Sequence, residues 1–108
     1  MEFVKAANVS DIPEGGMKAV KVGDEDIMIA NIGGRFYAVQ GLCTHRQGVL
    51  GNGKLEGIIV TCPRHGSMFE VPTGKSVAGP KILGVRGKTG DLSVYEVKVE
   101  GTNVLVKI

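Results

Sequence analysis

The two histidines of this 108-residue chain each lie shortly after one of its two cysteines. The first pair is Cys43-Thr44-His45 and the second is Cys62-Pro63-Arg64-His65, with sixteen residues between His45 and Cys62. Thiolates and imidazoles are the protein groups that bind zinc and iron most readily. If the two pairs lie on adjacent loops, two thiolates and two imidazoles meet at one point. The spacing therefore predicts a metal site.

Each Cys/His pair follows a segment that is typical of a β-strand. Residues 35–39 precede the first pair, and residues 58–61 precede the second. Residues 26–32 are apolar at nearly every position, which predicts a central strand buried on both faces. Gly33-Gly34 then predicts a two-residue turn into residues 35–39, because both glycines tolerate positive φ. We expect both pairs to lie on loops at strand ends.

Turn signals divide the rest of the chain into short strands. Asn52-Gly53 predicts another hairpin, and Val71-Pro72-Thr73-Gly74 predicts a type I turn. The C-terminal part indicates strands at 92–99 and 104–108, joined by a turn. In the first of these the apolar positions change phase between Val94 and Val97, which indicates a bulge or a strand buried on both faces. These signals predict an all-β domain of antiparallel strands, with the 17 glycines serving its turns.

Composition places the chain among ordinary globular proteins. Hydrophobic residues make up 43% and charged residues 22%, which excludes wholesale disorder. Thirteen Lys and Arg against eleven Asp and Glu give a net charge of +2, without the basic stripe of a nucleic-acid binder. No apolar run approaches the roughly 20 residues that cross a bilayer, and no secretory signal follows Met1. We expect one domain over residues 1–108 and a cytoplasmic location.

The pattern Cys43-x-His45…Cys62-x-x-His65-Gly66 resembles the cluster-binding signature of Rieske iron–sulfur proteins. The resemblance implies an antiparallel β-sandwich with a small cluster-binding subdomain at about residues 41–82. It also implies a [2Fe–2S] cofactor whose irons have two Cys and two His ligands. By this resemblance Cys43 and Cys62 bind the inner iron, and His45 and His65 bind the outer iron.

The resemblance also assigns residues around the cluster. Gly48 and Gly66 allow the backbone to approach it, and Ser67 donates a hydrogen bond to a cluster sulfide. Phe69 stands where high-potential relatives have a tyrosine whose hydroxyl bonds a ligand sulfur. Pro80 belongs to a loop that covers the cluster. Those relatives also join the two loops by a disulfide, whereas this chain has Gly48 and Arg64 at the two positions, so glycine, proline and packing alone must hold the loops.

The implied function is that of a soluble one-electron carrier between a reductase and an oxygenase or another redox partner. We expect no catalysis by the chain itself, because both histidines are already used and 108 residues leave no room for a substrate domain. Three alternatives remain open from the residues. The cysteines form a disulfide or are simply buried, the Cys₂His₂ set binds structural zinc in an interaction module, or the chain is a subunit of a larger reductase.

Overall fold

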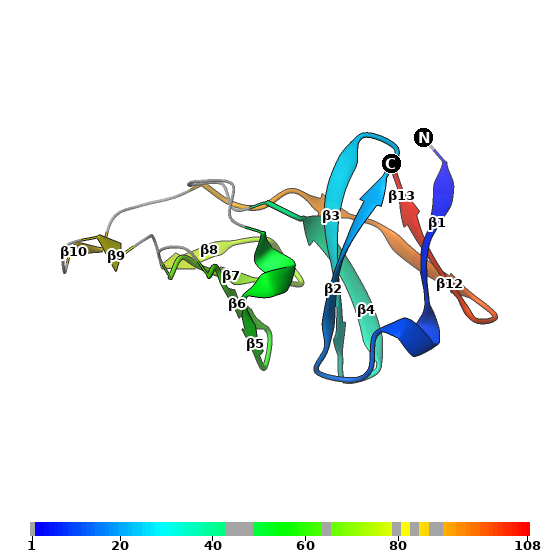
Figure 1. The fold of residues 1–108 in the computed structure, drawn as a ribbon, viewed down its shortest axis with the longest axis horizontal. Coiled ribbons are helices and arrows are strands. Elements are labelled where there is room, and N and C mark those ends of the chain that lie inside the picture. Colours follow the sequence, from blue (N-terminus) through cyan, green and yellow to red (C-terminus); the bar gives the residue numbers. More distant parts are fainter. Residues whose placement is uncertain (1, 43–48, 64–65, 79–80, 83–84, 87–89) are drawn as a thin grey trace.

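The computed structural model describes most of the chain as a stack of antiparallel sheets (Figure 1). The described residues are 2–42, 49–63, 66–78, 81–82, 85–86 and 90–108. Within these ranges there are β-strands and two short 3-10 helices, and no α-helix. The expected all-β fold class is confirmed.

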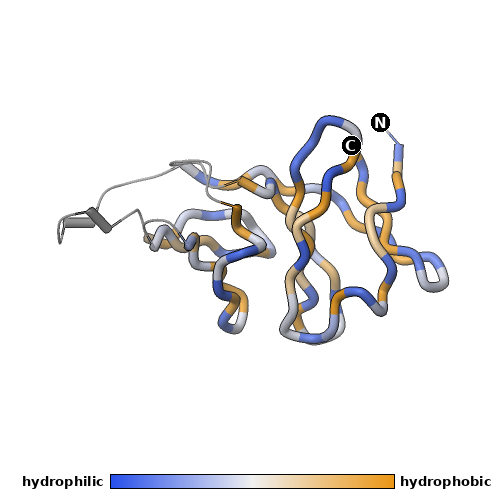
Figure 2. Tube along the Cα trace, in the orientation of Figure 1, coloured by the Kyte–Doolittle hydropathy of each residue, from blue (hydrophilic) through white to orange (hydrophobic). Residues whose placement is uncertain are grey.

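A four-stranded sheet forms the middle of the stack, in the order β11-β4-β3-β2. Its strands are β2 (Met17–Val22), β3 (Glu25–Ile32), β4 (Arg35–Gln40) and β11 (Val94–Tyr95). The predicted turn between β3 and β4 is confirmed, since Gly33 and Gly34 have φ of 63° and 87°. The polar turn between β2 and β3 is the blue segment at the top of Figure 2.

Strand β3 is buried on both faces, as its sequence predicted. Ile27 and Ile29 belong to one hydrophobic core, whereas Met28 and Ala30 belong to a second core on the opposite face. Successive side chains of a strand point to opposite faces, so a strand that divides two cores must be apolar throughout. The middle sheet therefore supports a layer on each side.

The first flanking layer joins the two ends of the chain. Its strands are β1 (Phe3–Asn8), β12 (Val97–Glu100) and β13 (Asn103–Lys107), in the order β1-β13-β12. Val104 and Val106 pack with Ile27 and Ile29 to form the core beneath this sheet. These two sheets make the sandwich on the right of Figure 1.

The phase change between Val94 and Val97 marks a change of sheet. β11 pairs with β4 in the middle sheet, whereas β12 pairs with β13 in the outer sheet, and Glu96 lies between them. The predicted single strand over 92–99 is therefore wrong. The side-chain phase reverses because the chain leaves one sheet and enters the other.

The second flanking layer carries the segment around Cys62. Its strands, in the order β5-β6-β7-β8, are β5 (Lys54–Glu56), β6 (Ile59–Thr61), β7 (Met68–Glu70) and β8 (Ser76–Ala78). Val60 and Phe69 from this sheet pack in one core with Met28 and Ala30 of the middle sheet. A further antiparallel pair joins β9 (Lys81–Ile82) to β10 (Val85–Arg86).

Two predicted turns differ from the structure. Asn52-Gly53 is no hairpin, because Asn52 ends a 3-10 helix, η2 (Leu50–Asn52), and Gly53 caps it with φ of −84°. The hairpin lies at Gly57 instead, between β5 and β6, with φ of 61°. The chain does turn before Gly74, but the predicted type I turn is wrong: the Gly74 N–H donates to the carbonyl of Glu70, so the turn is one residue longer.

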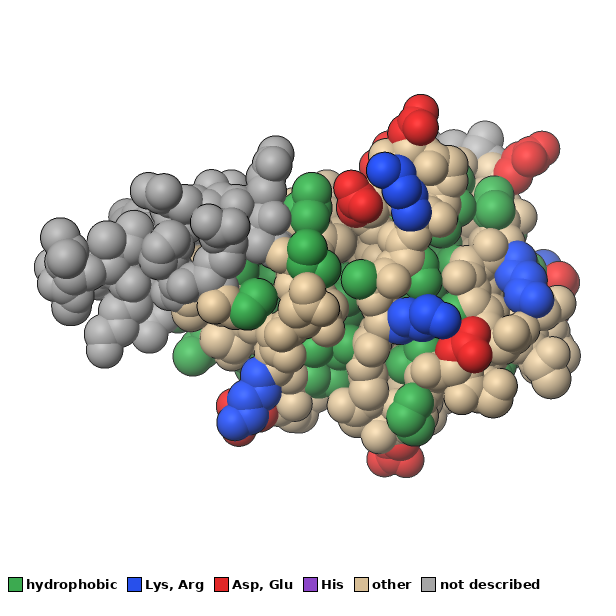
Figure 3. All heavy atoms as spheres, viewed as in Figure 1, with side chains coloured by type: hydrophobic (Ala, Val, Ile, Leu, Met, Phe, Trp, Pro, Cys, Tyr) green, Lys and Arg blue, Asp and Glu red, His purple; other side chains and the backbone are tan. Residues whose placement is uncertain are grey.

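Charged side chains of both signs are interspersed on the face of the molecule shown in Figure 3. Among the described residues, four ion pairs form: Lys18–Asp11, Lys54–Glu56, Lys98–Glu100 and Lys107–Glu96. Most of these side chains are well exposed to solvent, so the ion pairs add little to the stability of the fold.

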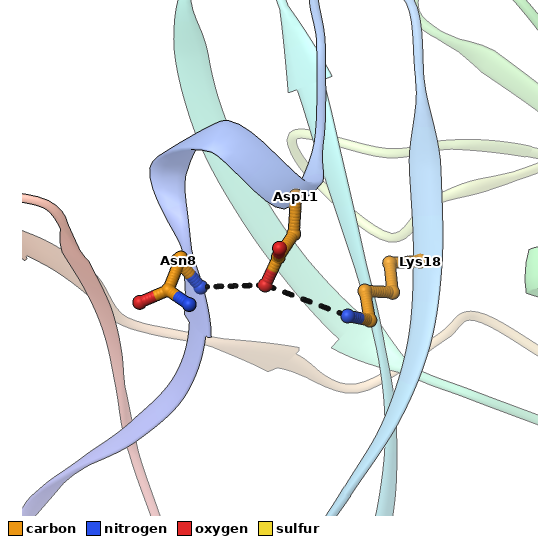
Figure 4. Close-up of polar contacts among 3 residues, drawn as sticks. All are labelled: Asn8, Asp11 and Lys18. Atoms are coloured by element: carbon orange, nitrogen blue, oxygen red, sulfur yellow. Dashed lines mark hydrogen bonds and ion pairs between the residues drawn. The ribbon is translucent and has the colours of Figure 1, made fainter.

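The pair at Asp11 includes a backbone contact (Figure 4). Asp11 lies in the 3-10 helix η1 (Val9–Asp11), and its carboxylate accepts the Asn8 N–H at 3.0 Å and the Lys18 ammonium at 3.5 Å. The Asn8 hydrogen bond, together with Lys18, lowers the pKa of Asp11 below its usual value.

Candidate metal centre

The structure describes four of the residues that the sequence assigned to the site: Cys62, Gly66, Ser67 and Phe69. The others, Cys43, His45, Gly48, His65 and Pro80, lie outside the described residues. Of the four predicted ligands, Cys62 alone can be placed.

Cys62 directly follows β6, as predicted, and begins a tight turn that leads back into β7. Its backbone N–H donates to the carbonyl of Ser67 at 2.7 Å, and the Gly66 N–H donates to the carbonyl of Cys62 at 3.2 Å. Gly66 has φ of 76°, which favours glycine over other residues. Two backbone hydrogen bonds therefore join Cys62 to the residues that lead into β7.

The Cys62 side chain lies in the hydrophobic core that the middle sheet shares with the β5–β8 sheet. It is 3% exposed, and its neighbours in that core include Val60, Phe69 and Leu92. A charged thiolate in such surroundings requires a compensating positive charge. A metal ion supplies that compensation, because thiolates bind metals in the deprotonated form.

Ser67 lies at the end of the same turn and is 1% exposed. Among the described residues, no hydrogen-bond partner lies within reach of its Oγ. A buried hydroxyl without a partner costs about 1–3 kcal/mol, so native structures rarely keep one. This hydroxyl lies beside the turn that starts at Cys62, and its acceptor is not among the described residues.

Phe69 is fully buried in β7 and packs in the core that contains Cys62. Its ring fills the space that a tyrosine ring would fill, but it brings no hydroxyl. Ser67 directly precedes β7 and Phe69 lies within it, so both residues follow closely after Cys62.

The segment that precedes Cys43 is closely packed against the middle sheet. The Gly41 N–H donates to the carbonyl of Asp26 at 2.8 Å, and a Cβ on Gly41 would lie 2.9 Å from the backbone nitrogen of Ile27. Leu42 pairs with Val49, so the two residues that flank the segment 43–48 lie side by side. The close approach of the two backbones thus requires glycine at position 41.

Sequence reasoning missed a second close approach, at Gly53. A Cβ on Gly53 would overlap the carbonyl oxygen of Thr61, the residue directly before Cys62. Gly41, Gly51 and Gly53 have no positive φ, and each meets neighbouring atoms where a side chain would begin. The expectation that the glycines serve only turns is therefore wrong for these three. No local signal distinguishes a packing glycine from a turn glycine, since the packing depends on distant residues.

No helix in the described part of the chain is long and apolar enough to cross a membrane.

Comparison with known proteins identifies the family. Residues 2–96 match the family model described as the Rieske [2Fe-2S] domain. The ferredoxin component of naphthalene 1,2-dioxygenase/salicylate 5-hydroxylase systems from Ralstonia sp is 37% identical over 106 residues, which are 98% of this chain and 95% of the relative. The ferredoxin component of biphenyl 2,3-dioxygenase from Rhodococcus jostii is 35% identical over 108 residues, which are 100% of this chain and 94% of the relative.

A solved structure has the same fold. A chain in the complex of reduced oxygenase and oxidized ferredoxin in carbazole 1,9a-dioxygenase matches with a TM-score of 0.84 and 33% identity, over 96% of this chain and 100% of that chain. The cofactor of the matching domain is a [2Fe–2S] cluster. The buried cysteine at a strand end, the glycine turn after it and the matched family model together show that this chain belongs to the Rieske [2Fe-2S] domain family.

Proposed function

We propose that this chain is a one-electron carrier that takes electrons from a reductase and passes them to an oxygenase. The full-length similarity to ferredoxin components of dioxygenase systems supports this proposal. The carrier performs no catalysis of its own and works in the cytoplasm. It consists of a single domain over residues 1–108, with residues 41–82 forming the cluster-binding part.

The proposed ligands are Cys43 and Cys62 for the inner iron and His45 and His65 for the outer iron. The described residues fit such a group at two points. Cys62 presents a thiol at the margin of an apolar core, and Ser67 presents a buried hydroxyl without a partner among the described residues. Cluster sulfides accept hydrogen bonds, so they provide the acceptor that this hydroxyl lacks.

When bound, the [2Fe–2S] group supplies reversible one-electron chemistry. The residues around the cluster determine its reduction potential. A hydroxyl that donates to sulfur stabilises the reduced form, since that form carries more negative charge. Ser67 therefore raises the reduction potential, whereas Phe69 supplies no second donor. We propose a potential in the lower or middle part of the range of about −150 to +300 mV for Rieske centres.

The single observation that carries the proposal is the buried Ser67 hydroxyl in the turn that begins at Cys62. The test is anaerobic purification followed by iron and acid-labile sulfide analysis and EPR of the reduced protein. We expect one [2Fe–2S] cluster per chain and a rhombic signal whose average g lies below the free-electron value. Stoichiometric zinc without labile sulfide would overturn the proposal in favour of a structural zinc module.

The transfer of electrons needs its own test. The reduced chain is mixed in a stopped-flow instrument with an oxidised aromatic-ring dioxygenase, and re-oxidation is followed in the visible spectrum. We expect a rate that increases with oxygenase concentration. The Cys62→Ala chain is the matched control, and it is expected to give no signal. A wild-type chain that stays reduced with every oxygenase and redox protein tried would contradict the carrier function.

A further inference from the structure

We propose that Gln40 is a positioning residue that holds the backbone leading into Cys43 against the segment that supports Cys62. The inference rests on the proposed ligand set. It concerns how a chain without a disulfide between its two ligand loops keeps those loops in place.

Gln40 is the last residue of β4 and lies three residues before Cys43. Its Nε2 donates to the carbonyl of Leu42 at 2.8 Å, and its Oε1 accepts the N–H of Ser93 at 2.7 Å. The two contacts fix the orientation of the amide, since a carbonyl needs a donor and an N–H needs an acceptor. One side chain therefore links Leu42, the residue directly before Cys43, to Ser93, which lies 53 positions after Gln40.

The link is reinforced by the backbone. The Gln40 N–H donates to the carbonyl of Ser93 at 2.9 Å, so Gln40 and Ser93 make two hydrogen bonds with each other. Gln40 itself is half-buried, and its side-chain bond to Leu42 is partly buried, whereas its side-chain bond to Ser93 is exposed to solvent. The side-chain bond to Leu42 extends this paired structure by two residues, toward Cys43.

The segment that receives Gln40 is itself attached to the β5–β8 sheet. The Leu92 N–H donates to the carbonyl of Gly74 at 2.7 Å, and the Asp91 carboxylate accepts the N–H of Ser76 at 2.8 Å. Leu92 is 4% exposed and lies in the same core as Cys62. Gln40 thus ties the entry to Cys43 and the layer that carries Cys62 to one common segment, residues 91–93.

Two substitutions separate the contacts of Gln40. Gln40→Glu has the same shape and retains an acceptor for Ser93, but it loses the donor to Leu42. Gln40→Met has a similar length without charge and loses both side-chain bonds. The matched control is Asn31→Asp. The Asn31 amide also makes two hydrogen bonds to the backbone: its Nδ2 donates to the carbonyl of Ile12, and its Oδ1 accepts the N–H of Gly34. Asn31 lies beside the β3–β4 turn, at the opposite end of β4 from Gln40.

The test measures three properties of the cluster-loaded chains: the rate of bleaching in excess iron chelator, the EPR spectrum after reduction, and the urea midpoint of unfolding. We expect both Gln40 variants to bleach about two- to tenfold faster than wild type, as loss of one or two net hydrogen bonds implies. Gln40→Met, which adds no charge, is expected to change the EPR line shape. Asn31→Asp is expected to lower the urea midpoint more than either Gln40 variant, with the bleaching rate in native buffer close to wild type.

Bleaching rates and EPR spectra equal to wild type in both Gln40 variants would overturn the proposal. The proposal would also be overturned if the rate of bleaching increases only in proportion to the decrease in the urea midpoint. That result is expected if Gln40 only stabilises the fold. If Gln40→Glu fails to fold with a cluster, Gln40→Met provides the same comparison. A wild-type chain without iron and labile sulfide would instead overturn the proposed function and, with it, this inference.

Discussion

Cys62 and Ser67 are joined by a 2.7 Å hydrogen bond from the Cys62 N–H to the Ser67 carbonyl, across a turn in which Gly66 adopts positive φ. This bond places the predicted ligand thiol and the buried Ser67 hydroxyl at the two ends of one short turn. Both side chains are almost fully removed from solvent. A change at Ser67 therefore acts on the environment of Cys62 without removing a ligand.

Ser67→Ala is expected to lower the reduction potential by tens of millivolts, up to about 100 mV, because it removes a donor to sulfur. Protein-film voltammetry measures the shift. Ser93→Ala is the control, since the Ser93 side chain is exposed, and it is expected to leave the potential unchanged. An unchanged potential in Ser67→Ala would show that the hydroxyl does not serve the cluster.

Phe69→Tyr is expected to raise the reduction potential, because it adds a hydroxyl that can donate to a ligand sulfur. Phe69 is fully buried, so a tyrosine hydroxyl without a partner would cost about 1–3 kcal/mol of stability. Voltammetry and urea unfolding are measured together. A loss of stability at constant potential would mean that the new hydroxyl reaches no acceptor at the cluster.

Gly53→Ala is expected to reduce cluster retention, because the added methyl group must displace the Thr61 carbonyl next to Cys62. Gly57→Ala, in the β5–β6 turn, is the control. Its Cβ meets nothing within 4 Å, and its positive φ costs only about 1–2 kcal/mol. Iron content per chain distinguishes the two variants. Equal iron content in both would contradict a role of this close approach in placing Cys62.

A low pH is expected to weaken the contacts of the Asp11 carboxylate with the Asn8 N–H and Lys18. Its pKa is lowered in the folded chain by the Asn8 hydrogen bond and Lys18, so the folded state favours the ionised carboxylate. This contribution is complete above the unfolded pKa of about 3.9 and is lost as the pH falls through the folded value.

The matching measurement is urea unfolding between neutral pH and about pH 3, the range in which aspartate titrates. Wild type is expected to lose more stability over this range than Asp11→Asn. Asp24→Asn, which removes one carboxylate from the β2–β3 turn, controls for the change in net charge. A pH dependence in Asp11→Asn that equals wild type would show that the contact adds nothing to stability.

Substitution of a proposed cysteine ligand and substitution of a proposed histidine ligand are expected to have different effects on the cluster. Cys43→Ala or Cys62→Ala removes a charged ligand from the inner iron and is expected to prevent cluster assembly. His45→Cys or His65→Cys is expected to retain a cluster with a lower potential, because a negative ligand replaces a neutral one. Iron analysis and voltammetry test both statements. A higher potential in a His→Cys variant would contradict the assignment of histidine to the outer iron.

Features that depend on neighbouring residues could be predicted from the amino-acid sequence. The ligand types and their spacing led to the correct family, and the positive φ at Gly33, Gly34 and Gly66 lies where glycine was expected in turns or beside a ligand. The apolar residues on both faces of β3 correctly predicted a strand between two cores. The full ligand set stays a prediction, because Cys43, His45 and His65 lie outside the described residues.

Features that depend on residues far apart in the chain could not be predicted and became visible in the folded structure. The change of sheet at Glu96, the approach of Gly53 to Thr61 and the two contacts of Gln40 have no local signature. Each arises because folding brings distant parts of the backbone into contact. At such a contact, the absence of a Cβ allows close packing, and a single side-chain amide can join two segments. A sequence pattern reports which conformations a segment allows, whereas the packing of the sheets determines which segments become neighbours.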